Sequence, residues 1–179
     1  MTKETKNRFL VLTTMILLAV ATRLMPHPYN FAPITGIALF GGSQFSSKKS
    51  AFLVPMIAMF LSDLVLGFHT TMLAVYVSFA AIVGIGFWLR KKQTFSRIVA
   101  ATMASSILFF LVTNFGTWAL QSLYPKTAAG LATCYIAAIP FFQNTLLGDL
   151  VYSGVLFGSL SLIQKVLPSL RESELVIAH

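Results

Sequence analysis

TMLAVYVSFAAIVGIGFWLR, residues Thr71–Arg90, is the stretch that decides the fold class of this chain. It carries no charge before Arg90, and about 20 apolar residues form a helix long enough to cross the hydrocarbon core of a bilayer. The whole chain is 56% hydrophobic and only 10% charged, whereas a soluble domain is about 25% charged. The sequence therefore predicts an all-α integral membrane protein, with residues 1–179 forming one polytopic domain and no separate soluble domain.

Five further apolar stretches predict the remaining spans, at 9–25, 33–47, 50–68, 98–120 and 141–164. The stretch 33–47 is short and rich in glycine, so it could either cross the bilayer or dip in and return. The last apolar stretch begins near residue 131 and is too long for one straight span. Because proline removes a backbone donor, we expect Pro140 to separate a short segment (131–139) from the span 141–164.

The basic residues favour six crossings with both termini in the cytoplasm. With six spans, eleven of the 13 Lys and Arg residues face the cytoplasm, and only Arg23 and Lys126 lie outside. If 33–47 did not cross, every later loop would flip and nine would lie outside. The net charge of +8 therefore reflects basic cytoplasmic loops of a multi-pass membrane protein. It does not indicate nucleic acid binding.

Two aspartates, Asp63 and Asp149, lie inside the predicted spans, while the other acidic residues lie in the polar tails. A carboxylate at bilayer depth costs about 2.5–3.5 kcal/mol on insertion scales and therefore indicates a functional or structurally critical site. From the helical rise, Asp63 should lie roughly 8–9 Å and Asp149 roughly 12 Å below the outer helix ends. We expect both to face one pocket under the outer loops. Alternatively, either carboxylate could brace the helices.

Three predicted outer loops, 25–33, 67–71 and 121–127, bring further polar and aromatic side chains to this level. The candidate substrate-binding residues that hydrogen bond or stack are Asn30, Asp63, Asn114, Trp118, Asn144 and Asp149. Those that attract an anionic group are Arg23 and Lys126, and further loop candidates are His27, Tyr29, His69 and Tyr124. The aromatic residues are equally typical of an interfacial belt, and the histidines of ordinary loops.

No catalytic residue, metal ligand set or cofactor is predicted. The single cysteine, Cys134, excludes a disulfide framework and a multi-cysteine metal cluster, and we expect it to be a packing residue. No nucleophile or metal motif accompanies the aspartates, so we expect no enzyme. An acid/base pair of aspartates in a membrane enzyme is a weaker alternative.

Several segments together resemble a known family. They are RLMPHPYNFAPITGIALFGG from Arg23, FFLVTNFGTW from Phe109, YPKT from Tyr124, and the aspartate contexts Ser62-Asp63-Leu and Gly148-Asp149. These segments are similar to an uncharacterised bacterial family of predicted transport proteins. That family in turn resembles the substrate-binding (S) components of energy-coupling-factor (ECF) vitamin transporters.

This resemblance implies an S-component-like bundle of six helices that binds a small nutrient, such as a vitamin or its precursor, for uptake. The implied partners are a transmembrane coupling subunit and two ATPases, because this chain has no phosphate-binding Gly-rich loop of its own. The first span lacks the small-residue face with which many S components dock. A solitary proton-coupled transporter with Asp149 as proton carrier therefore stays open as an alternative. Thr2 stands where nickel- and cobalt-specific relatives carry histidine.

Overall fold

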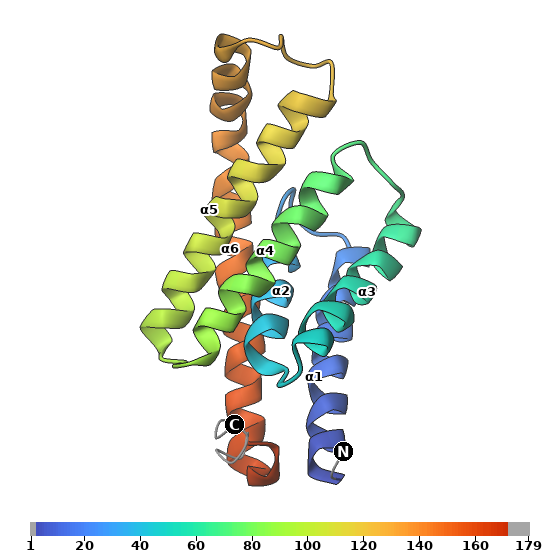
Figure 1. Cartoon of the computed structure of the whole chain (residues 1–179), viewed down its shortest axis with the longest axis vertical. Coiled ribbons are helices and arrows are strands. Elements are labelled where there is room, and N and C mark those ends of the chain that lie inside the picture. The colour runs from blue at the N-terminus through green and yellow to red at the C-terminus, as the bar shows by residue number, and fades with distance from the viewer. Residues whose placement is uncertain (1–2, 172–179) are drawn as a thin grey trace.

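The computed structural model describes residues 3–171, and this part of the chain consists of helices joined by loops, without strands (Figure 1). Its α-helices are α1 (Lys3–Ala21), α2 (Ile34–Gln44), α3 (Lys48–Leu66), α4 (Met72–Arg90), α5 (Phe95–Leu120) and α6 (Ala128–Val166). Two short 3-10 helices follow α1 and α6: η1 (Thr22–Leu24) and η2 (Pro168–Leu170). The prediction of an all-α chain is confirmed for the described residues.

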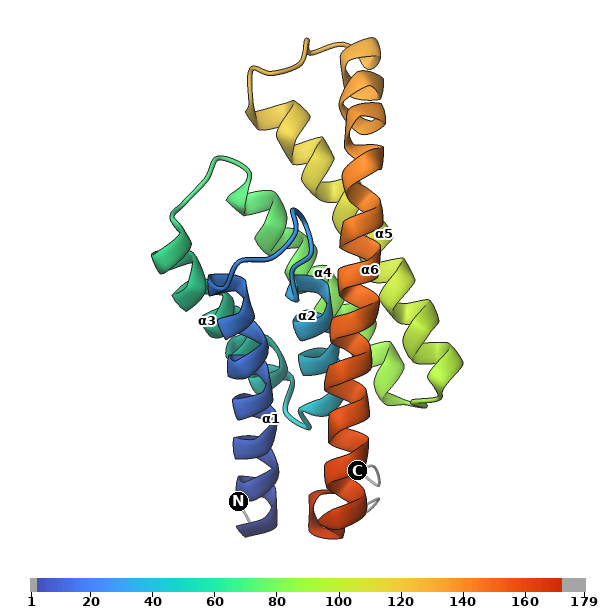
Figure 2. The same cartoon turned by 180° about the vertical axis from the view of Figure 1, so that it is seen from behind.

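The helices run alternately up and down between two ends of the bundle. The N-terminal end of α1 and the C-terminal end of α6 lie at the lower end in Figures 1 and 2, and the turns that follow α2 and α4 lie in the lower half. The connections 25–33, 67–71 and 121–127 join the upper ends of their helices, at heights that rise from about mid-height for 25–33 to the top for 121–127. The three loops that the sequence placed on one side of the membrane thus all join upper helix ends, but they are staggered in height.

Five of the six α-helices in the described part are long and apolar enough to cross a membrane, and α2 is the exception. With 11 residues, α2 spans only about 16 Å, roughly half of a bilayer core. It nevertheless leads the chain from the upper loops back to the lower end, as Figure 1 shows. The short, glycine-rich stretch therefore reverses the direction of the chain without forming a full-length span.

The expected break at Pro140 is wrong, because α6 continues without interruption from Ala128 to Val166. Pro140 lies on an exposed face of α6, so its ring needs no space inside the bundle. Long apolar helices tolerate proline when the freed backbone groups find other partners. The expected depth of Asp149 changes as a result, since it lies about 31 Å along α6 from Ala128, near the middle of the helix.

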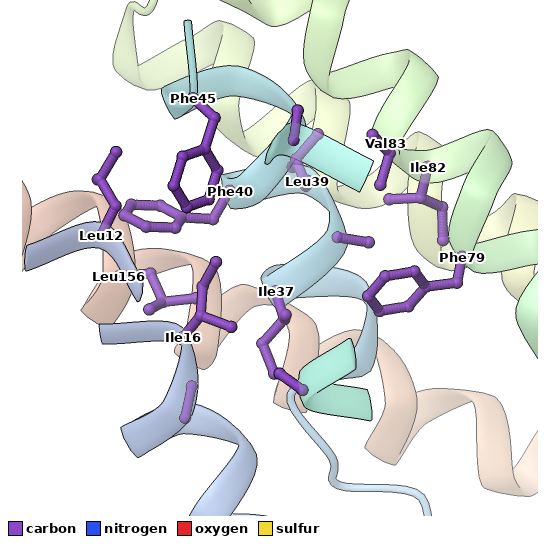
Figure 3. Packing of buried hydrophobic residues seen from close by; sticks show 14 of the residues in the cluster. Leu12, Ile16, Ile37, Leu39, Phe40, Phe45, Phe79, Ile82, Val83 and Leu156 are labelled. Atoms are coloured by element: carbon purple, nitrogen blue, oxygen red, sulfur yellow. The ribbon is translucent and has the colours of Figure 1, made fainter. Parts of the chain in front are cut away.

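The short helix α2 occupies the centre of the bundle and contacts every other α-helix. All of its residues except Ile34 are buried. Its apolar side chains Ile37, Leu39 and Phe40 join a core contributed by α1, α4 and α6 (Figure 3). The other labelled members of this core are Leu12, Ile16, Phe45, Phe79, Ile82, Val83 and Leu156.

Glycines allow α2 and α4 to approach at backbone distance. A Cβ atom added to Gly86 of α4 would lie only 2.7 Å from the Cα of Gly42 in α2. Small residues let helix backbones pack this closely where lipid supplies no hydrophobic driving force between helices. The crossing therefore depends on both glycines.

Large apolar side chains cover the outward faces of the long helices. They recur three to four residues apart, as in Leu53, Ile57 and Leu61 on α3, Met103, Ile107 and Leu111 on α5, and Leu147, Val151 and Val155 on α6. Soluble monomers rarely expose apolar surface this continuous. These faces give the chain the character of a multi-pass membrane protein.

Candidate functional site

A cavity of about 310 Å³ lies between the N-terminal end of α2 and helices α4, α5 and α6. Part of the loop 25–33 also contributes to its wall, through Asn30 and Ala32. Of the candidate residues predicted from the sequence, this cavity brings together Asn30, Asn114 and Asp149. Whether these side chains bind a ligand stays a prediction.

Asp149 lies in the wall of this cavity and is 1% exposed. Its carboxylate accepts a hydrogen bond from Ser106 Oγ of α5 at 2.6 Å. Thr35, in the first turn of α2, lies beside this carboxylate in the cavity wall. Pro33, the residue at the N-cap of α2, makes no side-chain capping bond, and Asp149 places its carboxylate near this positive end of the helix.

The opposite end of α2 is held by basic side chains. Arg8 of α1 donates to the carbonyl oxygen of Gln44 at 3.0 Å, and Arg90 of α4 donates to the carbonyl oxygens of Gly42 at 2.9 Å and Ser46 at 3.0 Å. A helix carries partial positive charge at its N-terminus and partial negative charge at its C-terminus. The short helix α2 therefore has an acidic side chain near its first turn and two basic side chains that bond its C-terminal end.

The neutral polar side chains of α5 and α6 in the cavity wall donate to their own helices. Thr113 Oγ1 donates to the carbonyl oxygen of Phe109 at 2.7 Å, and Thr145 Oγ1 to that of Phe141 at 3.4 Å. Asn114 Nδ2 likewise donates to the carbonyl oxygen of Phe110 at 2.8 Å. These groups therefore present mainly acceptor oxygens to the cavity.

Aromatic side chains form much of the remaining wall. Phe109 and Phe110 come from α5, and Phe141 and Phe142 from α6. The rings of Phe110 and Phe142 pack against each other with their centroids 4.8 Å apart. The cavity thus combines a small number of convergent polar groups with apolar, aromatic surface, which is the usual composition of a small-molecule site.

The second aspartate, Asp63, lies outside this cavity. Its Oδ1 forms an ion pair with Arg23 of η1 at 2.9 Å, and its Oδ2 accepts a hydrogen bond from Tyr76 Oη of α4 at 2.8 Å. Arg23 also donates to Ser62 Oγ. Asp63 is 4% exposed, so this ion pair is buried and holds the end of α1 to α3 and α4. The expectation that both aspartates face one pocket is not met by this geometry.

Two other candidates, Trp118 and Lys126, build the turn between α5 and α6. Trp118 Nε1 donates to the carbonyl oxygen of Pro125 at 2.9 Å. The Lys126 ammonium group lies 5.6 Å from the centroid of the Trp118 ring and donates to the carbonyl oxygens of Trp118 and Gln121. Tyr124 lies in the same turn and is half-buried. None of these three side chains lines the cavity.

The remaining candidates lie in or beside the upper loops. Tyr29 and His27 are exposed, and His69 is exposed with its Nδ1 3.0 Å from Thr71 Oγ1. Asn144 Nδ2 donates to the carbonyl oxygen of Tyr29 at 3.1 Å, so it ties the first loop to α6. Among the residues described by the structure, no group of three or more His, Cys, Asp or Glu side chains could hold a metal ion.

Sequence reasoning missed several residues that line the cavity or contact Asp149. They are Thr35, Ser106, Thr113, Thr145 and the four phenylalanines. Serine and threonine inside apolar helices usually bond their own backbone, so they carry no distinct signal in the sequence. The repeated Phe-Phe pairs at 109–110 and 141–142 were the one visible hint.

Residues 3–170 match the sequence profile of a family of unknown function (DUF6580), and the chain belongs to that family. Neither the curated proteins nor the solved structures contain a significant match to it.

Proposed function

We propose that this chain is a membrane-embedded substrate-binding protein for uptake of a small nutrient, similar to the S components of ECF transporters. The observation that carries this proposal is the cavity below the upper loops, in which one buried carboxylate meets acceptor oxygens and aromatic rings. A carboxylate inside an apolar bundle is costly, and such residues mark substrate or ion sites more often than ordinary packing positions. A cavity of about 310 Å³ suits a ligand of vitamin or vitamin-precursor size.

The proposed location is the bacterial cytoplasmic membrane, with the lower end of the bundle inside. Several exposed lysines support this orientation, since Lys48 and Lys49 follow α2 and Lys91 and Lys92 follow α4 at that end. Basic loops are retained in the cytoplasm. The cavity would then face the outer leaflet, where a nutrient arrives. Energy for uptake would come from a coupling subunit with two ATPases.

The proposal is tested by the small molecules that the purified protein retains. Protein isolated in lipid nanodiscs from cells grown in rich medium should carry a stoichiometric small molecule detectable by mass spectrometry. Ala138→Phe adds a ring to the cavity wall, whereas Ala137→Phe adds the same ring at an exposed neighbouring position. We expect the first variant to lose the molecule and the second to keep it. Equal retention by both, or no saturable binding by the wild type across a nutrient panel, contradicts the proposal.

A second candidate function is a solitary transporter, which works without partner subunits. A second groove, between α5 and α6, supports this candidate. This groove has a volume of about 690 Å³ and is lined by Thr102 of α5 and by Leu150 and Ser153 of α6. Leu150 and Ser153 follow Asp149 within about one helical turn of α6, so the two spaces lie along the same stretch of this helix. Uptake into proteoliposomes that contain this chain alone would support a solitary transporter. Uptake only after addition of ATPase partners would exclude it.

A further inference from the structure

The cavity wall carries one ionisable side chain among the described residues, and that side chain is acidic. Asp149 has no ion-pair partner in the cavity wall. The two basic residues that the sequence suggested for ligand binding make contacts outside the cavity. Arg23 pairs with Asp63, and Lys126 donates to carbonyl oxygens of the α5–α6 turn. The positive end of α2 offsets only about half of an elementary charge. When Asp149 is ionised, a residual negative charge therefore faces the cavity.

The carboxylate of Asp149 can accept another donor. Its two oxygens offer about four acceptor positions, and Ser106 Oγ fills one of them at 2.6 Å. Neighbouring groups add to this acceptor character. Thr113 and Thr145 spend their O–H groups on their own helix carbonyls and keep oxygen atoms for a ligand. Asn114 uses one of its two amide N–H groups on Phe110 and can offer its side-chain oxygen as well as the second N–H.

The aromatic walls complement the same kind of ligand. Phe110 and Phe142 lie in contact with each other, and Phe109 and Phe141 complete the apolar surface. The face of an aromatic ring attracts a cation electrostatically and also packs against a ring of the ligand. An anionic ligand would meet no basic side chain among the described residues that line this cavity.

From these observations we infer that the cavity binds an organic cation that bears N–H donors, an amine or protonated nitrogen heterocycle attached to a small ring system. The ammonium or ring N–H group donates to Asp149 and to the oxygens of Thr113 and Asn114, while the ring packs among the phenylalanines. This inference rests on the proposed binding function and names its substrate class. It also replaces the expectation that Arg23 and Lys126 attract an anionic group.

The test uses ring compounds in matched sets that differ only in charge. One set is tryptamine, tryptophol and indole-3-propionate, and a wider library repeats the amine, alcohol and acid series on other rings. Binding to the full chain in nanodiscs is measured by thermal shift and then by calorimetry. We expect amine members to bind at least about tenfold more tightly than their alcohols, the usual weight of a charge-assisted hydrogen bond, and acids to bind most weakly.

Variants then assign the preference to named groups. Asp149→Asn should bring the amine down to the affinity of the alcohol. Because this change also alters the surroundings of the first turn of α2, a second pair is needed. Thr113→Val removes a cavity oxygen, whereas Thr117→Val removes a hydroxyl that makes the same kind of backbone bond one turn further along α5, outside the cavity lining. We expect about a tenfold loss of amine affinity in the first and no change in the second.

The possible outcomes distinguish an error in the ligand class from an error in the proposed binding function. Hits confined to alcohols or acids, or an equal effect of Thr113→Val and Thr117→Val, overturn the cation assignment and leave a binding protein of another specificity. An absence of hits in every charge class overturns the binding function and the inference with it. Amine hits that depend on Thr113 support both.

Discussion

Replacing Gly86 by alanine should destabilise the bundle, whereas replacing Gly84 should not. Both residues lie in α4, two positions apart, so the gain in helix propensity, about 1 kcal/mol, is the same for each. At Gly86 the new Cβ would lie 2.7 Å from the Cα of Gly42 and 2.8 Å from the carbonyl oxygen of Leu39. At Gly84 it would meet no atom within 4 Å.

The difference in stability between these two variants isolates the overlap. The atoms that oppose the Gly86 Cβ belong to the backbone of α2 and cannot rotate away. Overpacking a core costs typically 1–3 kcal/mol, and backbone overlap belongs at the upper limit, about 3 kcal/mol. For a chain of this size that corresponds to a melting temperature lower by about 6–12 °C.

Thermal unfolding in nanodiscs, followed by tryptophan fluorescence, measures this difference directly. Gly84→Ala should melt at or slightly above the wild-type temperature. If Gly86→Ala melted together with Gly84→Ala, α2 would not approach α4 at backbone distance, and the central position of the short helix would be in error.

Three further predictions concern the ion pair, the topology and the α5–α6 turn. Asp63→Asn leaves Arg23 buried without its counter-ion and should lower the free energy of unfolding by about 3–5 kcal/mol. The double variant Arg23→Met with Asp63→Leu should restore most of this stability. Equal losses in both variants would refute the bracing role. Single cysteines at positions 69 and 92, introduced by His69→Cys or Lys92→Cys in a Cys134→Ala background, should react with an impermeant maleimide from opposite sides of the membrane. Labelling of both from the same side would contradict a single membrane crossing by α4 between them. Trp118→Phe removes the hydrogen bond to Pro125, which should cost about 1 kcal/mol of stability and lower the melting temperature by a few degrees. Ligand affinity should not change. A loss of affinity would place Trp118 in the binding site.

The sequence predicted which segments are helical, but it did not predict which side chains of different helices contact one another. Hydropathy located every apolar helix, since about 20 uncharged residues leave few other choices. It overestimated the span at 33–47, because the short helix α2 is held inside the bundle by side chains of other helices. Arg8 and Arg90 bond carbonyl oxygens of its last turn, and such partners have no local signature in the sequence. Pro140 was read as a break because its exposed position on α6 is invisible in the sequence.

The two aspartates illustrate the same limit within the site. Both stand in similar apolar contexts, and both are buried. Only the structure separates them, since the partner of Asp63 lies 40 positions earlier, at Arg23, and the partners of Asp149 lie on α2 and α5. The depth argument placed the pair at one level, but it could not specify which faces of α3 and α6 they occupy.

We propose that Asp149 serves the ligand cavity and that Asp63 braces the bundle. Calorimetric titration of the tightest-binding amine into three proteins distinguishes these roles: wild type, Asp149→Asn and the double variant Arg23→Met with Asp63→Leu. We predict that Asp149→Asn loses at least about tenfold in affinity and that the double variant binds as the wild type does. Full affinity in Asp149→Asn together with loss of binding in the double variant would contradict the account.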